Sequence, residues 1–435
     1  MARINQLLTD IENKIDKIEE ILSFKNLYLP ISTKRCRVEG CTICKSNKPH
    51  FCKVCKNTDS THFSHNCPYK DTLDIFIKKN AQLIESINLN NFIDENRNIC
   101  ITKKNVLIIL SYVYIIAKNN NGLPFSENKY EHFNFNYWFQ NCNAKIDCIV
   151  NYFKMMHYLS INSPSKYEKI LLQDITITIK KSIILNEENI KNIKGNLSNF
   201  SITEDPIEKQ SDCIQADFAN KNIGGGVLRG GCVQEEIRFV ISPECLIAVL
   251  FYGKIEMKSN EAICIEGTNI FSNYSGYGNS FKFNGQNNTI NFDKADTIVA
   301  FDALHYSRAN ANLQYIDTQI NREINKCIAA FSKLSTNDNA PFATGNWGCG
   351  AFNGDPQLKL IIQWIAASIV GRNLTYNAYE DNRLINICKI GGLDNLNDLI
   401  QLIKSKYPTI SDLYTNCIKI CKTENKISLI YKLIE

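Results

Sequence analysis

The chain has 435 residues, of which 44% are hydrophobic and 21% charged, so it is long enough for about two or three folded domains and is not composed like a disordered protein. Residues 1–6 are too polar for a secretory signal peptide, and the longest apolar run, residues 106–117, is too short to span a membrane, which together predict a soluble protein. The net charge of +5 is unevenly spread, because residues 31–70 carry eight Lys or Arg against two acidic residues and so attract polyanions.

Residues 1–29 are predicted to form an amphipathic helix. Apolar residues follow each other at alternating spacings of four and three from Ile4 to Leu22, with charged residues between them. About three heptads is the shortest stretch for which a coiled coil is a reasonable interpretation. Residues 4–22 would therefore either join copies of the chain into a homo-oligomer or dock on their own protein, and Pro30 ends the element.

Residues 34–70 are predicted to form a small zinc-binding module, because six cysteines and three histidines are concentrated there. One set of four has the spacing C-x2-C-x6-H-x4-C, close to that of a zinc knuckle, and a second set of four lies upstream. The candidate zinc ligands are Cys36, Cys41, Cys44, His50, Cys52, Cys55, His62 and Cys67. Spacing leaves open how they pair and whether they hold one ion or two, and the alternative is a cysteine-rich linker.

This module is basic and carries two aromatic residues, Phe51 and Phe63, that could stack on the bases of single-stranded nucleic acid. It would then bring the protein to nucleic acid or to another polyanion, and the alternative is a protein-binding or purely structural role. The other twelve cysteines are scattered singly through apolar segments, where a reduced cysteine acts as a small hydrophobic residue. We therefore expect a reducing compartment, the nucleus or the cytoplasm.

Residues 71–200 are predicted to form a helical accessory region. The spacing of apolar residues predicts helices at residues 73–87, 103–118 and 144–158. Near the end of the region, residues 173–184 alternate between isoleucines and threonines and are expected to form a strand.

Residues 201–435 are predicted to form a layered α/β domain. Short apolar strands alternate there with helices and glycine loops, a pattern typical of a sheet with helices on both faces. The expected strands are residues 213–218, 262–265 and 296–301, and the expected helices are residues 235–241, 313–334 and 357–370.

The segment that begins at the end of the first of these strands combines a carboxylate, an amide, three glycines and a pair of glutamates. The residues are Asp217, Asn220, Gly224, Gly225, Gly226, Gln234, Glu235 and Glu236. Consecutive glycines let backbone N–H groups approach an anion closely, and the glutamates begin a helix. Each feature alone is weak evidence, because glycine runs are common in turns and acidic residues at a helix start favour the helix dipole.

A second glycine loop, residues 344–355, precedes a helix that is expected to begin near Pro356. Its four glycines supply backbone donors at a helix start, which suits a second phosphate. The two loops together predict that a diphosphate is held between them.

These motifs resemble those of the poly(ADP-ribose) glycohydrolase family. The glycine run, the seven-residue spacer and the Gln-Glu-Glu of residues 234–236 are similar to the family's signature. The similarity extends to DFAN at 217–220, YSGY at 274–277, DALH at 302–305 and TGNWGCGAF at 344–352, and it covers roughly residues 144–435 in collinear order. The resemblance implies a macrodomain-like three-layer α/β sandwich that holds ADP-ribose in a cleft and needs no cofactor for catalysis.

The resemblance also implies roles for individual residues. Glu236 would protonate the departing ribose oxygen and then activate water, while Glu235 would hold ribose hydroxyls. Asp217 and Asn220 would orient that ribose or the glutamates, both glycine loops would cradle the pyrophosphate, and aromatic rings would pack on the nucleotide. The residues implied in substrate binding are Asp217, Asn220, Gly224, Gly225, Gly226, Gln234, Tyr277, Gly348, Cys349, Gly350, Ala351, Phe352 and Tyr379.

The implied reaction cleaves ribose–ribose O-glycosidic bonds of poly(ADP-ribose), with ADP-ribosylated proteins as partners. Its acid must keep a proton near neutral pH, which burial and neighbouring negative charge favour and a helix amino terminus opposes. The alternative is a non-catalytic macrodomain that reads ADP-ribose and is targeted by the zinc module, but a reader does not need the adjacent glutamates. His305 is expected to be a buried structural histidine.

Overall fold

The computed structural model describes residues 68–119, 135–334, 338–379, 381–390, 392–423 and 429–434. The predicted helix of residues 1–29 and the predicted zinc ligands from Cys36 to Cys67 lie outside these residues. None of the helices that the structure describes is both long enough and apolar enough to cross a lipid bilayer.

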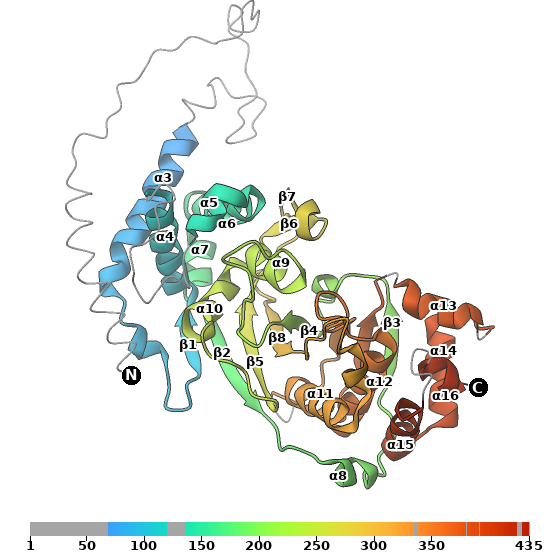
Figure 1. Ribbon diagram of the computed structural model, residues 1–435. Helices are drawn as coiled ribbons and strands as arrows, with labels where there is room; N and C mark the ends of the chain where they lie inside the picture. The colour runs from blue at the N-terminus through green and yellow to red at the C-terminus, as the bar shows by residue number, and fades with distance from the viewer. Residues whose placement is uncertain are drawn as a thin grey trace, which may run out of the picture.

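An eight-stranded mixed sheet forms the centre of the described structure (Figure 1). In their order across the sheet, the strands are β1 (Ile99–Thr102), β2 (Asp174–Lys181), β5 (Glu261–Thr268), β8 (Asp296–Asp302), β4 (Ile214–Ala219), β9 (Phe342–Gly345), β10 (Leu374–Asn377) and β3 (Phe200–Thr203). The pairs from β1 to β8 are antiparallel, and those from β8 to β3 are parallel. A separate hairpin is formed by β6 (Ser272–Ser275) and β7 (Lys282–Gln286).

Parallel pairing brings several loops to one edge of the sheet. Ala219, the last residue of β4, is in register with Asp302 at the end of β8. In the same way Gly345 at the end of β9 is in register with Asn377 at the end of β10. The loops that follow these strands therefore begin at the same carboxyl edge, where open α/β sheets commonly bind their ligands.

Helices cover both faces of the sheet and give the described structure three layers. Neighbouring residues of β8 point to opposite faces, so Val299 belongs to one hydrophobic core and Ala300 to the other. The first core contains α8 (Glu187–Lys191), α11 (Asp317–Phe331), α12 (Pro356–Ile369), α13 (Asn382–Ile390), α14 (Leu396–Lys406), α15 (Ile410–Cys421) and α16 (Leu429–Ile434). The second contains α3 (Pro68–Ala81), α4 (Lys103–Asn119), α5 (Asn136–Asn141), α6 (Asn143–Asn162), α7 (Pro164–Leu171), α9 (Gln234–Ile241) and α10 (Leu246–Tyr252).

The predicted elements match the observed ones closely where the apolar segment is long or has a clear period. The strand expected at 296–301 is β8, and the helix expected at 357–370 is α12. The single helix expected at 313–334 is instead a 3-10 turn (Ala311–Tyr315) followed by α11, because Ile316 has an extended backbone between them. The sheet takes β1 and β2 from the segment 71–200, so it includes strands from both sides of residue 200, and the division into domains stays a prediction.

Candidate active site

The first turn of α9 is attached directly to the end of β4 through Gln234. Its side-chain Oε1 accepts a hydrogen bond from the Phe218 N–H at 2.7 Å, and its Nε2 donates to the Ala216 carbonyl at 3.0 Å. Gln234 borders the cavity described below, but its amide is already engaged with the strand. The attachment places Glu235 and Glu236 next to the carboxyl edge of the sheet. Only 2% of Glu235 and 6% of Glu236 are exposed.

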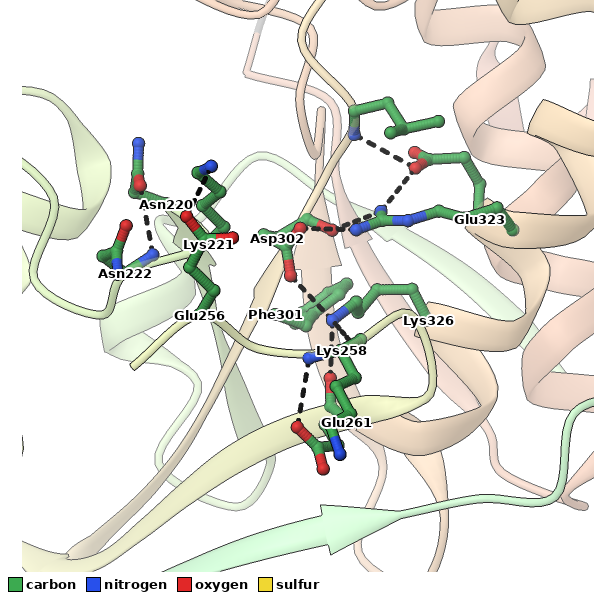
Figure 2. Close-up of polar contacts among 12 residues, drawn as sticks. Asn220, Lys221, Asn222, Glu256, Lys258, Glu261, Phe301, Asp302, Glu323 and Lys326 are labelled. Atoms are coloured by element: carbon green, nitrogen blue, oxygen red, sulfur yellow. Dashed lines mark hydrogen bonds and ion pairs between the residues drawn. The ribbon is translucent and has the colours of Figure 1, made fainter. Parts of the chain in front are cut away.

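Glu235 is held by the backbone of the first glycine loop. Its Oε1 accepts a hydrogen bond from the Gly224 N–H at 2.6 Å, and its Oε2 accepts one from the Asn220 N–H at 2.8 Å. The Asn220 side chain is used within the loop, because its Oδ1 accepts from the Asn222 N–H at 3.1 Å (Figure 2). Asn220 therefore orients Glu235 through its main chain.

Glu236 accepts a hydrogen bond at the N-terminus of its own helix, α9. Its Oε2 accepts a hydrogen bond from the Val233 N–H at 2.9 Å, and its Oε1 accepts one from the Gly226 N–H, also at 2.9 Å. In the first of these bonds the third residue of the helix satisfies the N–H group of the N-cap residue Val233, whose own side chain has no acceptor. Glu236 thus joins α9 to the glycine loop.

Gly225 lies between the two carboxyl groups. A Cβ atom there would be 2.5 Å from Glu235 Oε2 and 2.8 Å from Glu236 Oε1, and its φ is +46°. Its own N–H donates to the Asn222 carbonyl at 3.1 Å. All three glycine N–H groups are therefore engaged inside the protein, where the buried carboxyl groups need donors and the glycines provide them. The expectation that this loop cradles a diphosphate stays a prediction.

A third carboxyl group, Asp217, is buried beside the glutamates. Neither of its oxygens has a hydrogen-bond partner among the residues that the structure describes. Burial, reinforced by the charge of Glu236 and opposed by Arg238, raises the pKa of Asp217 to about 8. Burial, with Asp217 and Glu236, also raises the pKa of Glu235 well above its usual range, although the amides of Asn220 and Gly224 oppose this. The cluster therefore retains protons that exposed carboxyl groups would release.

This proton retention predicts how stability depends on pH. Between the usual value of 3.8 and the raised value of about 8, folded Asp217 holds a proton that the unfolded chain has released. Its contribution to the free energy of unfolding should therefore be complete below pH 3.8 and be lost as the pH rises through about 8, with a slope of at most ~1.4 kcal/mol per pH unit. Urea unfolding at a series of pH values should show that the free energy of unfolding falls less steeply with rising pH in Asp217→Asn than in wild type. Equal slopes for the two proteins would contradict the raised pKa of Asp217.

A cavity of about 410 Å³ lies at the same edge of the sheet. Eight residues expected to bind substrate border it: Gln234, Tyr277, Gly348, Cys349, Gly350, Ala351, Phe352 and Tyr379. Asp217, Asn220, the three consecutive glycines and both glutamates are not among the lining residues. The expected site residues thus form two groups, a buried carboxyl cluster and an open cavity, which meet at Gln234.

The second glycine loop has unused backbone donors at the cavity. Within the part of the chain that the structure describes, the N–H groups of Gly350, Ala351 and Phe352 donate no hydrogen bond. The turn is closed by the Asn353 N–H, which donates to the Gly350 carbonyl at 3.0 Å. Three successive unpaired N–H groups suit an anion, so the diphosphate expectation remains reasonable for this loop.

Buried charged side chains pack against the second glycine loop on the side of α11 and α12. Lys359 of α12 pairs with Glu323 of α11, and its Nζ lies 4.1 Å from the centroid of the Trp347 ring. Glu323 Oε1 also accepts from the Leu304 N–H at 3.0 Å. Figure 2 shows that this carboxylate lies near Asp302, whose Oδ1 is 2.7 Å from Lys326 Nζ. These contacts fix the segments that follow β8 and β9 relative to each other.

Aromatic rings stand at another part of the cavity wall. Tyr277 and Tyr379 meet edge to face, with centroids 5.6 Å apart. His305 is exposed and makes an edge-to-face contact with Phe352 at 5.4 Å, so the expectation of a buried histidine is wrong. The residue lies in the loop after β8, outside the buried end of that strand.

Three charged residues of the cavity wall, Glu208, Asp381 and Arg383, were missed by sequence reasoning. Glu208 accepts a hydrogen bond from Tyr274, and Arg383 pairs with Asp381 at 2.6 Å and donates to the Cys349 carbonyl at 3.3 Å. None of the three stands in a recognisable motif, so local sequence offered no signal. In the described part of the chain, no three or more His, Cys, Asp or Glu residues are grouped to hold a metal ion.

This region is similar to known proteins. Residues 187–386 match the family model described as poly(ADP-ribose) glycohydrolase (PARG), macro domain fold. The chain is 37% identical over 226 residues to poly(ADP-ribose) glycohydrolase 1 of Caenorhabditis elegans, covering 48% of this chain and 27% of that protein. It is 38% identical over 200 residues to poly(ADP-ribose) glycohydrolase 2 of the same organism, covering 42% and 40%. The chain thus spans less than half the length of these curated relatives.

A solved structure is also similar to the chain. It is poly(ADP-ribose) glycohydrolase from Deinococcus radiodurans in complex with ADP-ribose, at 15% identity and a TM-score of 0.31. The alignment covers 47% of this chain and 88% of that one.

Proposed function

We propose that this chain, whose residues 187–386 belong to the poly(ADP-ribose) glycohydrolase catalytic-domain family with the macro domain fold, hydrolyses the ribose–ribose O-glycosidic bonds of poly(ADP-ribose) and releases ADP-ribose. The observation that carries this proposal is the adjacent pair Glu235 and Glu236, buried on backbone amides beside a cavity. A protein that only reads ADP-ribose needs the cavity but not two carboxyl groups behind it.

Glu236 is the proposed general acid and base. Cleavage of a glycosidic bond passes through an oxocarbenium-like state, so the departing ribose oxygen must receive a proton. Each oxygen of Glu236 accepts only one amide in the structure, which leaves lone pairs that can carry that proton. After the sugar leaves, the same carboxylate would take a proton from the attacking water.

The neighbouring carboxyl groups supply the proton balance for this step. The raised pKa values of Asp217 and Glu235 keep protons inside the cluster near neutral pH. Glu235 would also accept hydrogen bonds from ribose hydroxyls, because each of its oxygens likewise accepts only one backbone N–H. Because the three groups interact, a pH–rate profile should report apparent values of the cluster as a whole.

The cavity is the proposed site for the ADP-ribose unit next to the cleaved bond. The unpaired N–H groups of Gly350, Ala351 and Phe352 suit the diphosphate. Tyr277 and Tyr379 offer faces and edges for the adenine ring. A volume of about 410 Å³ lies in the range expected of small-ligand pockets.

A direct assay tests the proposal. Purified protein is incubated with labelled poly(ADP-ribose), and free ADP-ribose is measured by chromatography against time. The expected result is release of ADP-ribose and shortening of the polymer. Polymer that is bound but stays intact would favour the alternative, a non-catalytic reader, and polymer that is neither bound nor cut would overturn both.

The amino-terminal module is a separate proposal that rests on sequence alone. We propose that the eight Cys and His ligands between Cys36 and Cys67 bind one or two structural zinc ions and that the basic module directs the enzyme to nucleic acid or polymer. With few apolar residues, such a module depends on its metal for folding.

Metal analysis tests the module independently of catalysis. Protein purified without chelator should contain about one or two zinc ions per chain, and Cys52→Ser should lose one of them. Hydrolysis of short polymer should continue after the loss. Zinc-free protein would contradict the metal proposal, whereas loss of hydrolysis in Cys52→Ser would contradict the independence of the two parts.

A further inference from the structure

A buried lysine outside the family-matched region holds the loop between the glycines and the catalytic glutamates. Lys145 lies in α6, and 1% of the residue is exposed. Its Nζ donates to the Val227 carbonyl at 2.7 Å and to the Arg229 carbonyl at 2.9 Å. Both acceptors belong to the short segment that links Gly226 to α9. The contact spans more than eighty residues of sequence, so it joins two distant parts of the chain.

Two further side chains hold the same pair of carbonyls. Trp138 of α5 donates from its indole Nε1 to the Val227 carbonyl at 2.6 Å, and Lys145 Nζ lies 5.6 Å from the centroid of its ring. The Cys142 thiol, between α5 and α6, lies 3.9 Å from the Arg229 carbonyl oxygen. Figure 1 shows α5 and α6 close to α9, and α6 packs against α9. The linking segment is therefore held from outside by the helical region.

The linking segment leads directly to Glu236. The Gly226 carbonyl accepts hydrogen bonds from the Arg229 N–H at 2.9 Å and from the Gly231 N–H at 3.2 Å, so the segment folds back on itself. The Gly226 N–H donates to Glu236 Oε1. On the other side, a Cβ atom at Gly231 would lie 2.7 Å from the same oxygen. A shift of the segment would therefore move Gly226 and Gly231, which lie on either side of the Glu236 carboxyl group.

We propose that Lys145 is a positioning residue for Glu236, and that α5 and α6 are part of the catalytic unit although they precede residues 187–386. This inference rests on the proposed function, because it names what orients the proposed acid. The described partners of Lys145 are Val227, Arg229 and Trp138, and none of them lines the cavity, so its effect should fall on turnover rather than on ligand affinity.

A matched pair of variants separates positioning from stability. Lys145→Met removes the three N–H donors but keeps an unbranched side chain of similar length. Lys180→Met is the control, because Lys180 is also buried and donates to two backbone carbonyls, Ala330 at 2.7 Å and Ser332 at 2.6 Å. Neither of these acceptors lines the cavity or contacts the glutamates. Both variants lose the same kind of interaction, and only one of them loses it beside Glu236.

The experiment measures three quantities for each protein: kcat on poly(ADP-ribose), Kd for ADP-ribose by calorimetry, and the thermal midpoint. For Lys145→Met we expect kcat to fall by ~10- to 100-fold, since a misplacement of about 1 Å can cost ~10²-fold, while Kd changes less than about threefold. Lys180→Met should lose a similar amount of thermal stability with kcat close to wild type. Lys145→Arg, which keeps the charge and donors, should recover part of the lost kcat.

The outcomes distinguish this inference from the proposed function. A wild-type protein that releases no ADP-ribose overturns the function, whereas equal kcat in wild type and Lys145→Met overturns only the positioning role. An equal fall in kcat for both methionine variants overturns it as well. If Lys145→Met does not fold, Trp138→Phe removes one donor to the Val227 carbonyl and keeps an aromatic ring; a fall in kcat at constant Kd then supports the role, and unchanged kcat overturns it.

Discussion

Replacing Glu236 by glutamine is expected to lower the release of ADP-ribose by ~10²- to 10⁴-fold, while ADP-ribose still binds. An amide keeps the shape of the carboxyl group but can neither give a proton to the leaving oxygen nor take one from water. In the structure it can also accept only one of the two hydrogen bonds, from Gly226 or from Val233, because its NH2 group faces the other donor. Affinity should persist because Glu236 does not line the cavity.

A nearby glutamate provides the control for this variant. Glu256 pairs with Lys221 at 2.7 Å, and 61% of its side chain is exposed (Figure 2). Glu256→Gln thus makes the same chemical change beside the same loop, on its solvent side, and should leave turnover within about twofold of wild type because exposed ion pairs contribute little. A fall of less than about tenfold in Glu236→Gln, or an equal fall in both variants, would contradict the assignment of Glu236 as acid and base.

The sequence predicted well those parts of the fold that have a local physical signature. Strands β4 and β8 are buried on both faces and are short, mostly apolar segments, so they were found within a residue or two. Helix α12 was found because Asp355 and Pro356 form a common helix start and thirteen of its fourteen residues are buried. Strands β9, β10 and β3 were missed, since each has only four residues and little room for a pattern.

The sequence could not show which partner each backbone N–H group of the glycine loops faces. A glycine run predicts N–H groups that can approach an anion, but not which anion they meet. In the first loop the anions are Glu235 and Glu236 themselves, whereas the second loop leaves the N–H groups of residues 350–352 unpaired at the cavity. Two loops with similar composition therefore use their backbone N–H groups differently in the structure.

Long-range contacts explain the remaining misses. Lys145 belonged to the helix expected at residues 144–158 and Trp138 lay outside the expected helices, and nothing near either residue in the sequence indicates the carbonyls of Val227 and Arg229 as partners. The acidic cluster shows the same limit. Asp217 was expected to orient a ribose or the glutamates, but its raised pKa depends on complete burial and on Glu236, which is nineteen residues away in sequence.

Replacing Gly225 by alanine is expected to reduce turnover by ~10²-fold or more, and to leave the affinity for ADP-ribose largely unchanged. Sequence reasoning alone gave the opposite expectation, a loss of affinity, because it placed this loop on the diphosphate. In the structure the added methyl group would collide with Glu235 Oε2 at 2.5 Å and with Glu236 Oε1 at 2.8 Å. At least one carboxyl group must move, and neither lines the cavity where ADP-ribose is proposed to bind.

Two alanine variants separate this collision from backbone strain. Gly371 has a φ of +67° and open space around its Cβ position, so Gly371→Ala has the strain of a left-handed residue without any contact. Gly231→Ala would press on Glu236 alone, at 2.7 Å from Oε1, and should lower kcat without disturbing Glu235. Measured together with Kd and the thermal midpoint, kcat should be near wild type for Gly371→Ala, lower for Gly231→Ala and lowest for Gly225→Ala. If Gly225→Ala instead keeps its kcat and loses affinity, the first loop does contact the diphosphate, and the glutamates must release its amides when substrate binds.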